Sequence, residues 1–252
     1  MKKGWFHSTF WMGLLLFGLC SSLTAGAVVN AVQEKTEEKK IPVYSVETEE
    51  KQVALTFDCA WNVEDLDSIL ATLEKNQVKA AFFVTGEWAE QYPQAVKTIV
   101  KAGHDIGNHG DGHKHMNALS LEECRQEIFE LHKKVFELTG VEMTLFRPPY
   151  GEYNNTVITA AEETGYYSIQ WDVDSLDWKN YGKDQMINQV LENQSLQNGS
   201  IILLHNGTMY TAQALQGIID GLTNRGYRCV PVSELIYKQN YEIDHTGRQR
   251  KK

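Results

Sequence analysis

Apolar and polar positions alternate in blocks along most of this chain. Short apolar runs predict strands at 53–57, 79–84, 105–107, 145–147, 167–172, 201–204 and 227–230. Between these runs, apolar residues recur three or four positions apart and predict helices at 63–76, 93–102, 120–139, 155–164, 184–193 and 212–224. Apolar strands that alternate with helices are typical of a parallel sheet covered by helices. We therefore expect an α/β fold, a distorted (β/α) barrel of about seven parallel strands in a single domain.

The first 27 residues follow a different pattern. Two lysines at positions 2 and 3 precede an apolar run over 10–23, and Ala25, Gly26 and Ala27 follow. This combination is typical of a secretory signal peptide at 1–27. An uncleaved membrane anchor is the alternative, because continuing the run to Val32 gives about the 20 residues that span a bilayer. Either way we expect an extracytoplasmic protein, secreted or anchored on the outer face of the cytoplasmic membrane.

Polar segments flank the globular part. Residues 28–45 include the charged run QEKTEEKK and are expected to form a polar linker. Residues 238–252 end in basic residues and are expected to form a solvated, disordered tail, which leaves 46–237 as the globular domain. The formal net charge of −9 argues against a nucleic-acid partner. We expect a monomer whose only membrane contact is the N-terminal segment, if that segment is retained.

The cysteines exclude a disulfide scaffold. Cys20 belongs to the leader, and the other three have no short spacing typical of a zinc site: Cys59, Cys124 and Cys229. At most one disulfide could form among these three, and one thiol would then be left over. An isolated cysteine is most often a small buried residue.

Ionisable residues follow five of the predicted strands. Asp58, His109, Arg147, Asp172 and His205 each fall at or just after a strand end. The carboxyl ends of parallel strands in a barrel lie on one rim, where functional side chains gather. We therefore expect these five residues to lie on one rim.

Two histidines in this set have a spacing that suits a metal. His109 and His113 are four residues apart in the segment HGDGH, and glycines between them favour a tight loop in which both rings turn to one side. Structural or surface histidines are the alternative for a pair seen alone. Asp111 is another possible ligand, or a turn residue between the two glycines.

Taken in order, the segments resemble a known family. TFDC (56–59), HGDGH (109–113), RPPYG (147–151), DSLDW (174–178) and LLH (203–205) match the five motifs of the polysaccharide deacetylases of the NodB-homology type, carbohydrate esterase family four. The resemblance spans about 52–235. Such enzymes remove acetyl groups from chitin oligomers, peptidoglycan amino sugars or xylan.

The resemblance implies a role for each matching residue. Asp58 matches the catalytic base and Arg147 the residue that positions it, while His205 matches the general acid and Asp177 the carboxylate that tunes it. Further matches concern the pocket: the backbone N–H of Tyr150 for the oxyanion, Trp178 for the wall and Leu203 for the acetate pocket. His109 and His113 match two of the three ligands of a divalent metal, for which we expect zinc, with cobalt or manganese as alternatives.

One position departs from the family pattern. The family normally has a second aspartate, the third metal ligand, where this chain has Cys59. The thiolate could replace it, which would favour zinc. Alternatively, water could complete the coordination of the two histidines, or the chain could be a glycan-binding relic that no longer turns substrate over.

These observations lead to one expected function and two alternatives. We expect a metal-dependent hydrolase that removes N-acetyl groups from an extracytoplasmic amino-sugar polymer, either peptidoglycan or a chitin-like oligomer. An esterase for O-acetylated polysaccharide such as xylan would use the same residues. A non-catalytic glycan-binding protein is the alternative from another class.

Overall fold

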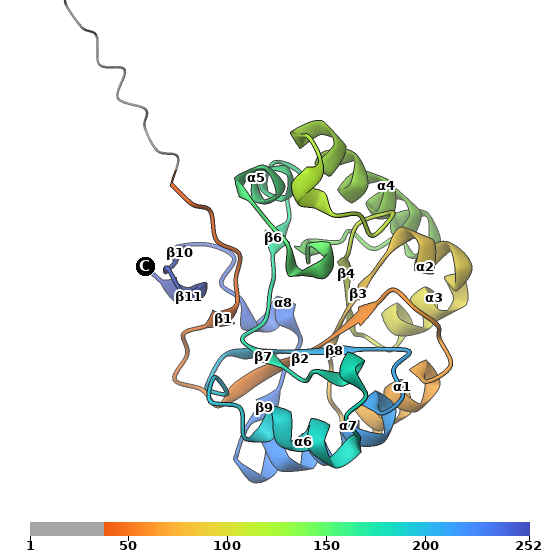
Figure 1. Ribbon diagram of the computed structural model, residues 1–252, viewed down its shortest axis with the longest axis vertical. Coiled ribbons are helices and arrows are strands. Elements are labelled where there is room, and N and C mark those ends of the chain that lie inside the picture. Colours follow the sequence, from red (N-terminus) through yellow and green to blue (C-terminus); the bar gives the residue numbers. More distant parts are fainter. Residues whose placement is uncertain (1–37) are drawn as a thin grey trace, which may run out of the picture. The chain divides into compact units, whose positions relative to one another are not determined.

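The computed structural model describes residues 38–252 (Figure 1). The expected signal peptide or anchor, and most of the expected linker, lie outside this part. The end of the linker that is described is packed against the domain, with Val43 and Ser45 buried. No helix within 38–252 is long and apolar enough to cross a membrane.

The centre of the fold is a curled sheet of mostly parallel strands. Six strands lie side by side in the order β8-β2-β3-β4-β5-β6, all parallel. Their bounds are β2 Gln52–Cys59, β3 Ala81–Val84, β4 Asp105–Asn108, β5 Leu145–Phe146, β6 Tyr167–Ser168 and β8 Ser200–His205. The expected single-domain α/β fold with a distorted barrel is confirmed as a curled half-barrel.

Short segments complete the edges of this sheet. β1 (Ser45–Val46) runs antiparallel to β8, and just before it Val43 forms a bridge to Ile169, directly after β6. The segment around β1 therefore lies between the two outer strands of the half-barrel. β7 (Val173–Asp174) pairs with β8, and β9 (Arg228–Cys229) pairs with β2.

Helices cover the outside of the sheet (Figure 1). They are α1 Leu66–Lys75, α2 Gly86–Gln91, α3 Pro93–Lys101, α4 Leu121–Thr139, α5 Asn155–Glu163, α6 Lys183–Leu191 and α7 Thr211–Asn224. The short helix α8 (Val232–Leu235) instead packs on the inner face of the sheet, in the cluster that contains Ala54 and Phe83. Three 3-10 turns lie between them: η1 Met116–Ala118, η2 Pro149–Gly151 and η3 Asp177–Lys179. The long helix α4 starts with a reciprocal capping box between Ser120 and Glu123 and ends at Gly140 in the left-handed conformation.

Strand β2 shows how the sheet separates two apolar layers. Leu55, Phe57 and Cys59 belong to the large cluster shared with the helices, whereas Ala54 belongs to a second cluster with residues such as Ala81 and Phe83. Because side chains alternate along a strand, Thr56 and Asp58 project to the same side as Ala54. The two layers therefore separate Asp58 from Cys59, although they are neighbours in sequence.

The prediction that residues 238–252 form a disordered tail is wrong. β10 (Tyr241–Ile243) and β11 (Arg248–Lys251) form an antiparallel pair, and β11 runs parallel to β1. The buried side chain of Gln249 bonds to both the N–H and the C=O of Tyr237. Composition alone indicated a solvated tail, because polar and basic residues surround the few positions that face inward, among them Ile243 and Gln249.

Candidate active site

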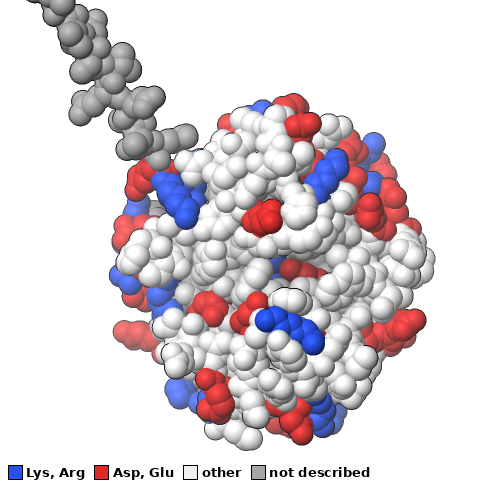
Figure 2. Space-filling view, in the orientation of Figure 1, with Lys and Arg blue, Asp and Glu red and all other residues white. Residues whose placement is uncertain are grey.

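The carboxyl ends of the parallel strands line one cleft. Asp58, next to last in β2, is the register partner of His205, the last residue of β8, while His109 follows β4 and Arg147 follows β5. The cleft encloses about 570 Å³ and is lined by Asp58, Ala60, Trp61, His109, His113, Tyr150, Gly151, Trp171, Asp174, Trp178, Leu203 and His205. The face shown in Figure 2 has a central hollow in which acidic and basic atoms are recessed, amid a mostly uncharged surface.

Asp172 does not belong to this rim. Its carboxylate accepts hydrogen bonds from the Ser200 hydroxyl (2.9 Å) and the Ile201 N–H (3.0 Å), at the start of β8 and therefore at the end opposite His205. The strand expected at 167–172 is split into β6 and β7, and this break places Asp174 rather than Asp172 beside the cleft.

Arg147 fixes the position and charge of Asp58. The guanidinium is fully buried and donates to Asp58 Oδ1 at 2.7 Å and to the Thr56 hydroxyl at 2.9 Å, while its carbon lies 4.2 Å from the centre of the Phe83 ring. Burial alone would raise the pKa of Asp58, but the positive charge of Arg147 brings the pKa below its ordinary value. Asp58 is thus a buried, ionised carboxylate at neutral pH.

The backbone of Arg147 also sets the tautomer of His109. His109 Nδ1 lies 2.7 Å from the Arg147 carbonyl oxygen, which can only accept, so Nδ1 carries the proton. The lone pair is therefore on Nε2, which lies 3.5 Å from Asp58 Oδ2. Burial lowers the pKa of His109, which keeps the ring neutral. A lone pair facing a carboxylate oxygen is an arrangement that a cation stabilises.

His113 supplies a second neutral imidazole beside the first. Its ring centre lies 5.0 Å from that of His109, and burial lowers its pKa to about 4. The loop turns sharply to achieve this, with left-handed backbone at Gly110 (φ 77°) and at His113 itself (φ 48°). Both rings are therefore neutral imidazoles, the form in which histidine binds a divalent metal ion.

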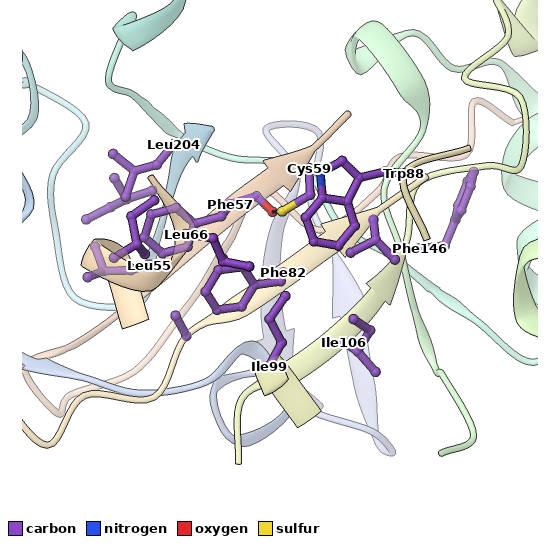
Figure 3. Close-up of a cluster of buried hydrophobic side chains, with 14 of the residues drawn as sticks. Leu55, Phe57, Cys59, Leu66, Phe82, Trp88, Ile99, Ile106, Phe146 and Leu204 are labelled. Atoms are coloured by element: carbon purple, nitrogen blue, oxygen red, sulfur yellow. Dashed lines mark hydrogen bonds between the residues drawn. The ribbon is translucent and has the colours of Figure 1, made fainter. Parts of the chain in front are cut away.

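Cys59 lies on the other face of β2. Its side chain is fully buried among Phe57, Phe82 and Trp88, as Figure 3 shows, and Sγ lies 3.8 Å from the Phe57 carbonyl oxygen. Burial raises the pKa of the thiol well above its ordinary value, and the charge of Asp58 adds to this. Across residues 38–252, no three His, Cys, Asp or Glu side chains form a group that could hold a metal.

Asp177 orients His205. One carboxylate oxygen lies 2.8 Å from His205 Nδ1, and the other accepts the His205 backbone N–H (2.6 Å) and the Thr211 hydroxyl (2.7 Å). Because the carboxylate accepts from Nδ1–H, Nε2 is the atom available for a reaction. Burial acts to lower the pKa of His205, but the hydrogen bond and charge of Asp177 raise it above its ordinary value.

The remaining expected residues also line the cleft. Leu203 is buried, whereas Tyr150 and Trp178 are about half exposed. Tyr150 has left-handed backbone (φ 59°) directly after the two prolines, and its ring stacks on His115 with centres 4.1 Å apart. Trp61 stacks on the His205 ring at 5.1 Å. Thr211 was not anticipated, because only its contact with Asp177 distinguishes it from any other residue at a helix start.

Comparisons with known proteins agree with this geometry. The profile of the polysaccharide deacetylase family matches residues 45–169. A peptidoglycan-N-acetylglucosamine deacetylase of Bacillus cereus is 36% identical, with 77% of this chain and 92% of that protein covered. The peptidoglycan-N-acetylmuramic acid deacetylase PdaA of Bacillus subtilis is 30% identical (87% and 82% covered). YlxY, an uncharacterised Bacillus subtilis protein, is 33% identical over 77% of this chain, which spans 60% of its length.

Among solved structures, one similar protein is described as a pseudoenzyme. BA3943 of Bacillus anthracis, a pseudoenzyme of carbohydrate esterase family 4, superposes with a TM-score of 0.74 at 33% identity, covering 77% of this chain and 68% of that one. A mutant of BA3943 is described as having restored enzymatic activity and matches equally well, with a TM-score of 0.74. The fold and the rim define a carbohydrate esterase-type hydrolase domain. The chain belongs to the polysaccharide deacetylase family, whose members include peptidoglycan deacetylases.

Proposed function

We propose that this protein hydrolyses N-acetyl groups on an extracytoplasmic amino-sugar polymer, either peptidoglycan or a chitin-like chain. The observation that supports this most is the pairing of Asp58 and His205 across adjacent strands in one cleft. The pKa of Asp58 is lowered and that of His205 is raised, so a base and an acid are both in their active forms near neutral pH.

Amide hydrolysis needs a stronger nucleophile than free water. A divalent cation held by His109 and His113, with zinc as our choice, would supply Lewis acidity toward water and the acetyl carbonyl. Asp58, held ionised by Arg147, takes the proton of the attacking water. The Tyr150 N–H donates to the developing oxyanion, and Leu203 contacts the acetyl methyl group.

Departure of the amine requires a proton on nitrogen. His205 donates it from Nε2, while Asp177 holds Nδ1–H and stabilises the charged ring. Trp178 and Trp61, on the cleft walls, exclude water and offer flat apolar faces to sugar rings.

Substrate chemistry separates the amide from the ester alternative. The full chain should release acetate from N-acetylglucosamine tetramer or peptidoglycan with added zinc, cobalt or manganese. An esterase would instead release acetate from acetylated xylan and leave the tetramer intact, and that result would replace the proposed substrate class.

A second candidate is a glycan-binding protein without turnover. It is favoured by the burial of Cys59 on the far face of β2, which leaves two histidines where the family pattern has three ligands, and by the similarity to BA3943. If the protein binds glycan but releases no acetate with zinc, cobalt or manganese, this result would favour the glycan-binding function over the proposed deacetylase activity.

We expect Asp177→Asn to move the alkaline limb of the pH–rate profile to lower pH. His205 must be protonated to act, so activity falls as the pH rises through its pKa, which Asp177 raises. Removing the charge of Asp177 lowers this pKa. The measurement is kcat/KM between about pH 5 and pH 9. Thr211→Val, which removes one hydrogen bond to Asp177 but keeps the charge, should shift the limb less. An unmoved limb in Asp177→Asn would exclude His205 as the acid.

We expect Cys59→Ala to keep the metal content and acetate release of the wild type. The thiol faces the core, so its loss should cost only about 1 kcal/mol of packing. Cys59→Asp should instead lower the Tm further than Cys59→Ala does, because it places a carboxylate in an apolar cluster close to Asp58 and Asp65.

Metal analysis and thermal unfolding of both Cys59 variants test whether the thiol binds the metal. Loss of zinc in Cys59→Ala would show that the thiolate is a ligand. A gain of zinc in Cys59→Asp would show that the end of β2 can turn this side chain toward His109.

A further inference from the structure

A buried carboxylate on α4 contacts the loop that contains His109 and His113. Glu127 is only 6% exposed, although glutamate in a helix usually faces solvent. Its Oε2 accepts the Gly112 N–H at 2.8 Å, and its Oε1 lies 2.6 Å from Lys114 Nζ. Its backbone C=O also accepts the Asp111 N–H at 3.1 Å. One residue therefore bonds to two successive N–H groups of the loop.

The bond to Gly112 is at the position where the loop is strained. Gly112 directly precedes His113, whose backbone lies in the left-handed region (φ 48°) that a β-carbon disfavours. Such a conformation persists only when surrounding contacts hold it. Other contacts hold the loop on either side of Gly112 and His113. Before them, Asn108 Oδ1 accepts the Gly110 N–H, and the Asp111 carbonyl accepts the Glu87 N–H at 3.1 Å. After them, His115 Nδ1 lies 3.1 Å from Glu152 Oε2, so the Glu127 bond to Gly112 is the side-chain hydrogen bond to the residue directly before His113.

We propose that Glu127 is the positioning residue of the candidate metal site, holding His113 where its ring converges with that of His109. The proposal rests on the proposed function for the identity of the ligand, a divalent metal. Glu127 lies outside the cleft lining and touches neither ring, so its effect passes through the Gly112 N–H. The ion pair with Lys114 is secondary, since Lys114 is largely exposed and such pairs contribute little.

Two conservative variants of Glu127 distinguish the effect of its side-chain length from the effect of its charge. Glu127→Gln keeps an acceptor oxygen at the same distance but loses the charge, and Glu127→Asp keeps the charge but is shorter by one methylene and withdraws from Gly112. In the full chain, we expect Glu127→Asp to weaken zinc binding about 10- to 100-fold, as loss of a ligand-orienting contact does. Glu127→Gln should bind zinc within about threefold of wild type. The control Lys114→Ala, which removes only the exposed ion-pair partner of Glu127, should also bind zinc within about threefold of wild type.

Hydrogen exchange of the metal-free protein gives a readout that does not depend on zinc. Amides of the 109–115 loop should exchange about tenfold faster or more in Glu127→Asp, and at nearly the wild-type rate in Glu127→Gln. If the wild-type protein binds no zinc, the zinc-dependent function proposed above is wrong. The hydrogen-exchange rates of the loop then test the role of Glu127 by themselves. Equal loop exchange or equal zinc affinity in Glu127→Asp and wild type would overturn the proposal, as would a larger effect in Glu127→Gln than in Glu127→Asp.

Discussion

Asp58→Asn is expected to lower the rate of acetate release by about 10²- to 10⁴-fold. Asparagine has nearly the same shape and can still accept the Arg147 hydrogen bond through its amide oxygen, but it cannot take a proton from water. The loss should therefore appear in kcat, with KM for the glycan little changed. Initial rates on N-acetylglucosamine tetramer, measured for both proteins at the same zinc occupancy, test this.

This substitution also leaves the buried guanidinium of Arg147 with a neutral partner, so some stability will be lost. Thr56→Val is the matched control, because it removes another acceptor of the same guanidinium and leaves the carboxylate in place. We expect Thr56→Val to lower the Tm while keeping acetate release within about tenfold of wild type. Unchanged turnover in Asp58→Asn would rule out the proposed base.

Arg147→Met is expected to destabilise the fold by about 3–5 kcal/mol at neutral pH, the usual effect of removing one partner of a buried ion pair. The charge of Asp58 would then be buried without its partner, and its pKa would rise because burial is no longer opposed. The base would also be partly protonated near neutral pH, so turnover should fall as well.

The stability loss in Arg147→Met should depend on pH in a direction that the pKa of Asp58 sets. In wild type the pKa of Asp58 is lower in the folded state, so this group stabilises the fold above its unfolded pKa, about 3.9, and the contribution is lost as the pH falls through the folded pKa. In Arg147→Met the folded pKa is raised, so the deficit should be largest at neutral pH and shrink toward about pH 4. Urea unfolding at both pH values measures it.

A double variant checks that the deficit arises from the pair itself. Asp58→Asn combined with Arg147→Met removes both charges, so it should be more stable than Arg147→Met alone. If the two losses simply add, the stability would come from packing around Phe83 and Thr56 and not from the ion pair.

The hydrophobic pattern predicted the framework of this site well. Strands and helices such as β2 and α4 lie where the pattern places them, because β2 is buried on both faces as a continuous apolar run and α4 buries one apolar face. The rule for parallel strands predicted the rim, since Asp58, His109 and His205 line one cleft and Arg147 is bonded to Asp58 from the buried side. The same rule failed for Asp172, since a strand interrupted after two residues sends its next side chains to the other end of the sheet.

Other features depend on contacts that periodicity does not encode. The orientation of Cys59 follows from the two-residue repeat of β2 once the strand is known to extend to its position, but the motif by itself suggested a ligand. The role of Glu127 could not be predicted from its neighbours in sequence, because it depends on a hydrogen bond to the Gly112 N–H, 15 residues away along the chain. The pairing of β11 with β1 joins the two ends of the domain and is equally invisible to a local pattern.

In the proposed reaction, Asp58 and His205 hydrolyse the amide bond between the acetyl group and the sugar nitrogen. The most direct measurement is the simultaneous count of acetate and of new primary amine when zinc-loaded full-length protein acts on N-acetylglucosamine tetramer or peptidoglycan. We predict equal amounts of both products with wild type, and formation of both slowed by about 10²- to 10⁴-fold in Asp58→Asn. No acetate and no amine from wild-type protein on either polymer, with zinc, cobalt or manganese, would contradict the account.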